Sequence, residues 1–265
     1  MQTPLSSPTA PSPDTRPRKP RYRVQVRRVR RLTPRMVRVT FASEELADFG
    51  WNGPAAHIKL IFEGEPGAGA DAARTTTRTY TPRAFNAGAR ELDVDFVIHG
   101  EGPASSWARQ AAVGQVLTIA GPGRSYAVDP AADWYLLAGD DTAIPAIGTI
   151  LESLPPTLKA LALIEVVDAA EEHALAERAP SDIRWLPRGA DPSNAGRELE
   201  AAVRRLELPP GSGRIYVACE ADAMRRIRRH LLQERQLPRA HVVTRGYWRL
   251  GETDHPDRDY GEDVG

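Results

Sequence analysis

The sequence predicts a two-part fold, an N-terminal antiparallel β-barrel followed by a C-terminal doubly wound parallel α/β domain. Two observations predict it. The first half contains short β segments separated by Gly- and Pro-containing turns, a pattern typical of small barrels. From about Ala131 onward, continuous apolar strands alternate with helical segments, as they do in a parallel sheet covered by helices.

Six short strands are expected in the first half, at 21–30, 35–42, 56–62, 78–83, 91–98 and 116–120. The segment LDVDFVI within the fifth strand places an apolar residue at every second position, as a half-buried strand does. Apolar residues also alternate with arginine or other polar residues in the first two strands, at Tyr22, Val24 and Val26 and at Val37, Val39 and Phe41. The segment 63–77 is polar and rich in glycine, so we expect a mobile surface loop there.

The second half begins with an apolar strand at 134–139 and a helix directly after it. Further strands are expected at 161–167, 183–186 and 214–219. Two more helices each have one apolar face, formed by Leu199, Ala202, Val203 and Leu206 in the first and by Met224, Ile227 and Leu231 in the second. Ligands of such sheets bind beyond the carboxyl ends of the strands, so we expect the site there.

The composition is that of an ordinary globular protein, with 265 residues, 41% of them hydrophobic and 26% charged. The single cysteine, Cys219, excludes an internal disulfide and a four-cysteine iron–sulfur cluster, and we expect no bound metal. No apolar run approaches the roughly 20 residues of a membrane helix, and the first residues lack the apolar stretch of a signal peptide. We therefore expect a cytoplasmic protein without membrane insertion.

Charge is unevenly distributed along the chain. Residues 1–40 contain ten Arg and one Lys against one acid, whereas residues 250–265 contain six acids against one Arg. The arginines could bind nucleic acid, but their period-two alternation places them on a sheet face instead of a groove-reading helix. Nucleic acid is therefore the disfavoured partner. The oligomeric state stays open, with a monomer favoured.

These boundaries divide the chain into four parts. They are a disordered leader at 1–20, the barrel domain at 21–129, the α/β domain at 130–249 and an acidic C-terminal tail at 250–265.

The first candidate motif is RTYTPR at 78–83. On one strand, Arg78, Tyr80 and Pro82 would share a face, and Thr79, Thr81 and Arg83 the other. An aromatic ring beside guanidinium and hydroxyl donors suits a flat, phosphorylated cofactor. The alternative is an exposed edge strand that carries Arg and Thr without binding a ligand.

The second motif begins at His99, where a strand ends and Gly100 and Gly102 permit a tight turn. Small residues then open a helix whose free backbone N–H groups could hold a pyrophosphate, namely Pro103, Ala104 and Ser105. Trp107 either packs on an adenine or closes the barrel, and both interpretations stay open.

The third motif, Asp140, Asp141, Thr142 and Ala143, follows the first strand of the second half. Asp or Thr can cap the next helix, and Pro145 is tolerated in its first turn, so helix N–H groups could face a phosphate. An ordinary capped helix is the alternative. The sequence contains no G-x-G-x-x-G, G-x-x-x-x-G-K-[ST], G-x-S-x-G or H-x-x-x-H motif, which disfavours a standard Rossmann dehydrogenase, a P-loop kinase, a serine hydrolase and a metalloprotease.

Six motifs in this order resemble the siderophore-interacting protein family, flavin-dependent ferric-siderophore reductases related to ferredoxin-NADP reductases. The motifs are RTYTPR, DFVIHGEGPASSWA, GPGRSY, WYLLAGDDTAIPAI, IEVVDAAEE and AMRRIRRHLLQERQLPRAHVVTRGYWRLGE. The resemblance runs from about residue 21 to about residue 253. One departure is Ala218-Cys219-Glu220, where the common wording in the family is AGE.

The resemblance implies an FAD-binding barrel and a domain for NADH or NADPH. Arg78, Tyr80 and Thr81 would hold the flavin, with Tyr80 against its ring and Thr81 near its reactive nitrogen. The phosphate and adenine side would be lined by His99, Gly102, Ala104 and Ser105, and the flanking cofactor candidates are Thr79, Arg83, Pro103 and Trp107. The turn Asp140, Asp141, Thr142 and Ala143 would receive the nicotinamide dinucleotide. The anionic iron chelate would meet Lys59, Arg124 and Arg249.

The expected reaction follows from the chemistry of these groups. A nicotinamide gives up two electrons as hydride and ferric iron accepts one, so a flavin can connect them, and no side chain is expected to act as catalytic acid or base. Oxygen ligands hold Fe(III) more tightly than Fe(II), so reduction would release the iron from its siderophore.

Coenzyme choice and two alternative functions stay open. Asp168, Glu171 and Glu172 after the second parallel strand could repel a 2′-phosphate and so favour NADH, or could form a solvated acidic turn. The alternative functions are a general flavin or quinone reductase and a non-enzymatic binder of nucleotides or polyanions.

Overall fold

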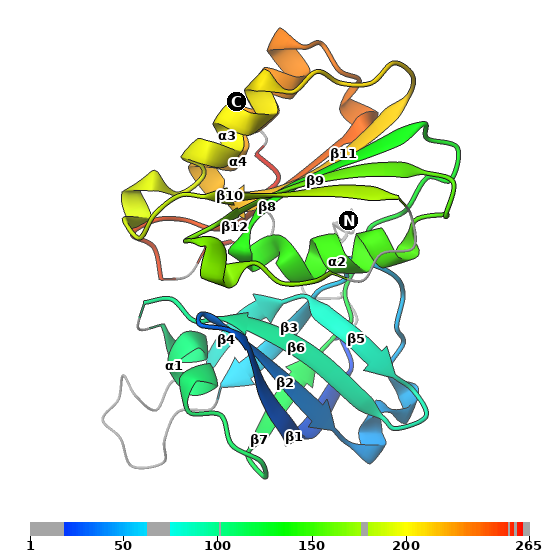
Figure 1. Ribbon diagram of the computed structural model, residues 1–265. Coiled ribbons are helices and arrows are strands. Elements are labelled where there is room, and N and C mark those ends of the chain that lie inside the picture. Colours follow the sequence, from blue (N-terminus) through cyan, green and yellow to red (C-terminus); the bar gives the residue numbers. More distant parts are fainter. Residues whose placement is uncertain are drawn as a thin grey trace, which may run out of the picture.

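The computed structural model describes residues 19–62, 75–100, 102–175, 180–253, 255–256 and 259–261. An antiparallel sheet forms the first domain and a parallel sheet with helices the second, which confirms the predicted fold class (Figure 1). Most of the predicted leader and of the loop predicted at 63–77 lie outside the described residues.

Seven strands form the antiparallel sheet, in the order β4-β3-β7-β1-β2-β6-β5. They are β1 (Arg21–Thr33), β2 (Met36–Ala42), β3 (Ile58–Phe62), β4 (Thr76–Tyr80), β5 (Pro82–Asn86), β6 (Glu91–Val97) and β7 (Val116–Ala120). The short helix α1 (Pro103–Arg109) lies between β6 and β7 in the sequence.

The predicted alternation is confirmed in β1 as far as Val26, whereas in β2 the polar Thr40 is buried together with Val39 and Phe41. Tyr22, Val24 and Val26 are buried in the barrel core, whereas the neighbouring Arg21 and Arg23 are exposed. The ladder between β1 and β2 shifts register between Val26 and Arg28, as at a β-bulge. Beyond the shift the alternation ends, and residues 27–31 are all exposed.

The strand predicted at 78–83 is in fact two strands. β4 pairs with β3 at one edge of the sheet, and β5 pairs with β6 at the other edge. Thr81 joins them, and Pro82 begins β5, a position where a strand tolerates the missing N–H of proline. The predicted common faces therefore do not extend across the motif, and Arg83 points into a different environment from Arg78.

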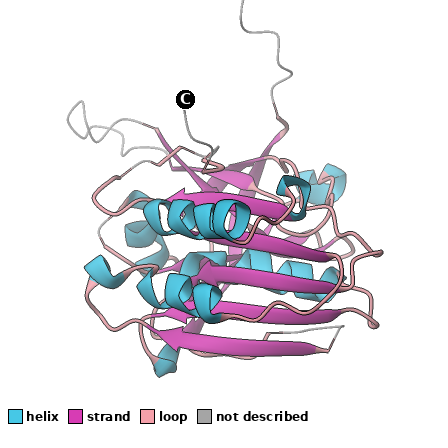
Figure 2. Ribbon diagram, turned by 90° about the horizontal axis from the view of Figure 1, so that it is seen from above, coloured by secondary structure: helices cyan, strands magenta, loops and turns pink. Residues whose placement is uncertain are grey.

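Five parallel strands form the second sheet, in the order β10-β9-β8-β11-β12. They are β8 (Trp134–Asp140), β9 (Lys159–Val166), β10 (Ser181–Pro187), β11 (Gly213–Glu220) and β12 (Val242–Trp248). The helices are α2 (Ile144–Ser153), α3 (Arg197–Arg205) and α4 (Ala221–Arg229). Figure 2 shows helices lying over the sheet. The sequence analysis did not predict β12, the strand at the edge beside β11.

The helices cover both faces of the parallel sheet. α2 lies between this sheet and the barrel, and α3 and α4 lie on the opposite face (Figure 1). Eight successive residues of α2, Ile144 to Leu151, are buried because the helix is covered on both sides. α3 buries only Leu199 and Val203, as expected for a helix with one face in solvent. No helix within the described ranges is both long and apolar enough to cross a membrane.

The two domains share a core and several polar contacts. Met36 and Val97 of the barrel belong to the same buried cluster as α2. At this junction, Arg83 Nη2 lies 2.5 Å from Glu152 Oε1 of α2.

Glu171 also bridges the domains. Its carboxylate accepts hydrogen bonds from Thr33 Oγ1 at 2.5 Å and from the Arg35 N–H at 3.2 Å. Glu171 therefore faces the barrel, and the interpretation of Glu171 as a group that repels a coenzyme phosphate was wrong.

We expect Glu171→Ala to lower the free energy of unfolding by about 2–3 kcal/mol, because a buried hydroxyl and a backbone N–H lose their acceptor. Its exposed neighbour Glu172 offers a matched control, and Glu172→Ala should change stability by less than about 0.5 kcal/mol. Urea unfolding of both variants measures the difference. Equal stabilities of the two variants would contradict the bridging role.

Candidate functional site

The candidate site lies where the corner between β4 and β5 meets the carboxyl ends of the parallel strands (Figure 1). Across this junction, the ring of His99, after β6, lies 6.2 Å from the ring of Trp248 at the end of β12. The same edge of the parallel sheet carries Asp140 and Glu220, the last residues of β8 and β11. Parallel sheets bind ligands at this edge, so the barrel contributes one wall and the sheet the other.

Tyr80 forms the aromatic part of the barrel wall. It opposes Ile58 on β3, and its ring centroid lies 4.6 Å from that of Phe96. Burial raises the pKa of Tyr80 above its ordinary value, so the phenol stays neutral. The neighbouring Thr79 is exposed, and Arg78 Nη1 donates to the Thr77 carbonyl at 2.9 Å. A held aromatic ring beside a guanidinium fits a flat anionic cofactor.

Thr81 and Arg83 contact the second domain. Thr81 is buried and forms a side-chain hydrogen bond with Tyr247 of β12, whose hydroxyl lies 2.8 Å from that of Tyr216. Burial, the largest cause, raises the pKa of Tyr247. Arg83 instead forms the ion pair with Glu152 described above, and its guanidinium lies close to Gly148. Thr81 therefore stays near the predicted flavin residues, whereas Arg83 secures the domain junction.

The turn after β6 is held from two sides. The His99 N–H donates to Ser105 Oγ at 3.0 Å, and Arg109 Nη2 donates to the Gly100 carbonyl at 2.6 Å. Gly100 has a φ of 52°, which a glycine adopts without strain, and both Gly100 and Gly102 border open space. A ligand can therefore approach this backbone closely.

Desolvation is the main cause that lowers the pKa of His99 below its ordinary value, and the charges of Arg109 and Arg188 add to it. His99 consequently favours its neutral form at this junction.

The remaining residues of α1 have packing roles. Pro103 occupies the first turn and Ala104 is buried. The ring of Trp107 lies 6.0 Å from Phe41, 5.8 Å from Phe62 and 5.5 Å from Phe96. Of the two interpretations of Trp107, the structure therefore favours closure of the barrel.

Asp140 connects three parts of the parallel-sheet wall. Its Oδ1 accepts from the Thr142 N–H at 3.0 Å and from Thr142 Oγ1 at 2.5 Å. Its Oδ2 accepts from the Glu220 N–H at 2.9 Å and from Trp248 Nε1 at 2.8 Å. A carboxylate has about four acceptor positions, so Asp140 is saturated by the protein and organises the turn that contains Asp141, Thr142 and Ala143.

Asp141 and Arg188 form a buried charged pair beside this turn. Arg188 Nη2 lies 3.3 Å from Asp141 Oδ2, and Arg188 Nε lies 3.8 Å from Glu165 Oε1. Burial, with the nearby Asp140 charge, raises the pKa of Asp141 to about 7. Arg188 Nη1 is buried, and no described residue accepts a hydrogen bond from it. An unpaired buried guanidinium nitrogen fits an anionic ligand such as a dinucleotide phosphate.

A cavity of about 380 Å³ lies next to Asp140. Glu220 lines this cavity, and its backbone N–H donates to the Asp140 carboxylate. Its lining includes Ser193, Arg197 at the start of α3, and Arg226 of α4. Arg226 Nε donates to Glu200 Oε2 at 2.5 Å. The cavity thus combines hydroxyl and guanidinium donors with the carboxylates of Glu200, Glu220 and Asp222, so its charge is mixed.

The three cations predicted to meet the substrate lie on separate elements. Lys59 is on β3 directly opposite Thr79, and Arg124 is exposed after β7. Arg249 follows β12 and pairs with Glu252 at 3.2 Å and Asp222 at 3.4 Å. The structure therefore brings Lys59 next to β4 and gives Arg249 acidic neighbours.

The sequence analysis missed Glu165, Arg188, Glu220 and Trp248 as site residues. The sequence analysis named Glu220 only because Ala218-Cys219-Glu220 differs from the AGE sequence that is common in the family. Arg188 follows a strand without any motif of its own, and Trp248 ends the strand that was not predicted. The one available signal was the position of Glu220 at the end of an apolar strand, since such ends border the ligand.

Comparisons with known proteins agree with this geometry. The sequence model described as siderophore-interacting FAD-binding domain matches residues 25–126, and the one described as siderophore-interacting protein matches residues 132–251. The chain is 33% identical to ferric vibriobactin reductase ViuB of Vibrio cholerae, over 83% of this chain and 86% of that protein. It is 28% identical to the NADPH-dependent ferric-chelate reductase of Escherichia coli, over 84% and 91% of the two chains.

A crystal structure of a siderophore utilization protein from T. fusca has a TM-score of 0.80 to this chain at 38% identity, covering 90% of this chain and 96% of that one. These matches confirm the predicted resemblance, the two-domain fold and the FAD-binding barrel. They also confirm the expectation of an FAD-dependent oxidoreductase.

The raised pKa of Asp141 makes a pH-dependent contribution to stability. Between the ordinary value of 3.8 and about 7, the folded chain keeps a proton that the unfolded chain has released. We therefore expect the free energy of unfolding of the wild type, relative to Asp141→Asn, to fall as the pH rises from 4 to 8. Denaturant titrations at several pH values measure this difference. Asp182→Asn, on exposed β10, controls for the chemical change, and a constant difference between wild type and Asp141→Asn would contradict the prediction.

Proposed function

Because the chain belongs to the siderophore-interacting protein family, we propose that it reduces ferric siderophores with FAD as cofactor and NADPH or NADH as electron donor. One observation carries the proposal: the aromatic and guanidinium groups of β4 and the carboxyl ends of the parallel strands meet at one junction, where His99 lies 6.2 Å from Trp248. A flavin held on the barrel would there face a dinucleotide held by the sheet.

When bound, FAD supplies the conversion between hydride transfer and single-electron transfer to Fe(III). The protein supplies position. Tyr80 would support the flavin ring, Arg78 would neutralise a phosphate, and Thr81 would lie at the corner near the ring. Thr79, His99, Gly102 and Ser105 would border the rest of the dinucleotide. Hydride transfer needs reacting atoms within roughly 3–3.5 Å, so these binding contacts determine the rate more than proton transfer does.

The dinucleotide donor would lie along the turn of Asp141, Thr142 and Ala143, whose conformation Asp140 fixes. Arg188 would meet its phosphates, and the cavity lined by Arg197 and Arg226 would take its adenosine end. The name of the Escherichia coli relative, NADPH-dependent ferric-chelate reductase, supports NADPH as the donor. The anionic chelate would approach past Lys59, Arg124 and Arg249, which increase its local concentration.

Three sequence-based predictions stay predictions. They are the cytoplasmic location, the absence of nucleic acid as a partner, and the monomeric state. A general flavin or quinone reductase is the alternative that the direct test distinguishes.

The direct test is a visible absorption spectrum of the purified protein, followed by anaerobic addition of NADPH or NADH and then of a ferric siderophore. We expect a flavin spectrum that bleaches faster with NADPH than with NADH and recovers when the ferric chelate is added. A protein that binds no FAD on titration would exclude the proposed function. Recovery with quinone but not with a ferric chelate would favour the general reductase.

Tyr80→Ala should lose bound flavin and lower turnover, because the aromatic support of the ring is removed. Base and aromatic stacking contributes about 1–3 kcal/mol, so the Kd for FAD should rise roughly tenfold or more. Tyr80→Phe is the matched control, since it keeps the ring and should keep the flavin. Fluorescence titration of the flavin-free protein measures both. Equal affinities of the Ala and Phe variants would remove Tyr80 from the site.

Arg249→Ala should raise the KM for an anionic ferric chelate by about threefold to tenfold, because one exposed charge is lost from the approach. Arg184→Ala is the control, since Arg184 is also exposed and pairs with Asp182 at 2.6 Å on β10. Steady-state kinetics at low salt measure the effect. Unchanged kinetics would remove Arg249 from the substrate site.

A further inference from the structure

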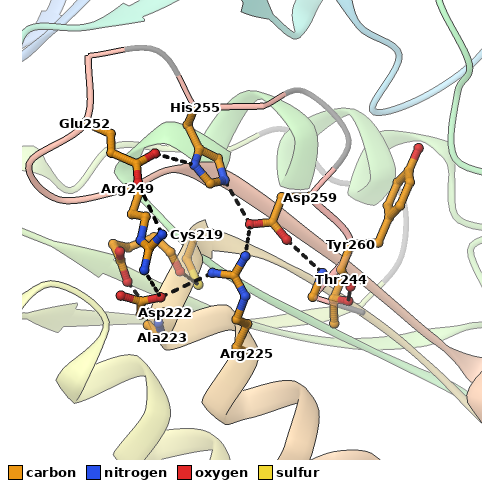
Figure 3. A network of polar contacts seen from close by, with 12 residues as sticks. Cys219, Asp222, Ala223, Arg225, Thr244, Arg249, Glu252, His255, Asp259 and Tyr260 are labelled. Carbon is orange, nitrogen blue, oxygen red and sulfur yellow. Dashed lines mark hydrogen bonds and ion pairs between the residues drawn. The ribbon is translucent and has the colours of Figure 1, made fainter. Parts of the chain in front are cut away.

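The acidic residues that follow β12 fold back onto the α/β domain in their described part (Figure 3). The Gly246 N–H donates to the Asp259 carbonyl at 2.8 Å, and Thr244 Oγ1 donates to the Tyr260 carbonyl at 2.5 Å. The guanidinium of Arg245 lies 4.3 Å from the centre of the Tyr260 ring. These contacts hold the segment against β12.

His255 lies between two carboxylates of this segment. Its Nδ1 is 3.3 Å from Glu252 Oε2, and its Nε2 is 2.8 Å from Asp259 Oδ2. The side chains of His255 and Asp259 are 7% and 8% exposed, so their contact is shielded from water, whereas the Glu252 side chain is 41% exposed. An imidazole has a donor on both nitrogens only when it is protonated, so both carboxylates receive a hydrogen bond only from the charged ring.

The contacts of His255 belong to a closed ring of six ionisable side chains in which acidic and basic groups alternate (Figure 3). Arg225 of α4 connects Asp259 at 2.6 Å with Asp222 at 3.2 Å. Arg249 connects Asp222 at 3.4 Å with Glu252 at 3.2 Å. Exposed ion pairs contribute little one by one, but in a closed network each group stays oriented by two neighbours. The ring therefore fixes Arg249, Glu252, His255 and Asp259 on α4.

The same segment touches the barrel at the flavin strand. Thr253 lies in the sequence between the ring members Glu252 and His255, and its carbonyl accepts a hydrogen bond from Arg78 Nη2 at 2.8 Å. β4 lies at an edge of the sheet, where no described strand pairs with its outer side. The contact with Thr253 therefore restricts the Arg78 side chain from outside the sheet. The orientation of Arg78 is thus linked to the charge ring of the other domain.

We propose that His255 is a positioning residue for the flavin site: by holding the C-terminal segment in the charge ring, it keeps the Thr253 carbonyl on Arg78 and so orients the guanidinium toward the cofactor. The inference rests on the proposed function, in which Arg78 binds a phosphate of FAD. His255 itself contacts neither reactant. Its effect reaches the cofactor through Thr253 and Arg78.

A double-mutant cycle tests this inference. We would titrate flavin-free protein with FAD and follow fluorescence for the wild type, His255→Gln, Arg78→Ala and the double variant. His255→Gln should raise the Kd by about tenfold, as expected when a charge-assisted contact is lost. In the Arg78→Ala background, the same change should have almost no further effect, because both substitutions act on one contact.

A pH series adds a readout that a purely structural role would not affect. The wild-type Kd should rise once the ring is deprotonated, since it then has one N–H donor for two carboxylates, and His255→Gln should remove this part of the pH dependence. The other charged groups facing His255 are Glu252 and Asp259, with Arg225 and Arg249 behind them.

Two further variants keep the test decisive. Asp259→Asn preserves shape while removing the charge, and it should reproduce the effect of His255→Gln if that variant is unstable. His230→Gln is the matched control, because His230 Nδ1 lies 2.7 Å from Glu234 beyond the far end of α4. An unchanged Kd in His255→Gln and Asp259→Asn, or additive effects in the cycle, would overturn the inference and leave the proposed function intact. A wild type that binds no FAD would overturn both.

Discussion

The site depends on the four hydrogen bonds of the Asp140 carboxylate. Two of them hold the turn after β8, and the other two connect this turn to the ends of β11 and β12. Because Trp248 is one of the donors, Asp140 also sets the position of the ring that meets His99 of the barrel. A buried carboxylate whose acceptor positions are all filled resists rotation. The parallel-sheet wall therefore keeps one shape before any ligand arrives.

The second constraint is the position of α2 between the two sheets. A helix buried on both sides cannot shift without disturbing both cores, since protein interiors are close-packed. Ion pairing between Arg83 and Glu152 and the hydrogen bonds of Glu171 add directional contacts at the same boundary. The distance between FAD on the barrel and a nicotinamide coenzyme on the parallel sheet would thus be set by the packing of α2, which lies away from the reacting atoms.

Much of the fold could be predicted because burial imposes a visible period on the sequence, as at Val24 and Val26 in β1 or Leu199 and Val203 in α3. The prediction failed where the structure depends on pairing between segments that are far apart in the sequence. The motif at 78–83 has strand-like residues throughout, and only Pro82 indicates that a second strand begins there. Arg78 and Tyr80 could be proposed from residue chemistry and resemblance. Arg188 and Trp248 could not, because their roles arise from contacts between segments far apart in the sequence.

The described residues of β4 and β5 do not pair with each other, so the wall of the barrel is open between these two strands. Unpaired strand edges are templates for strands of other molecules, and proteins usually cover or charge them. Here the edge of β4 borders the place where the cofactor would bind, and the C-terminal segment reaches it through Arg78. A cofactor bound where we propose would cover this edge, so we expect the chain without its cofactor to expose an unpaired strand edge and to aggregate more readily.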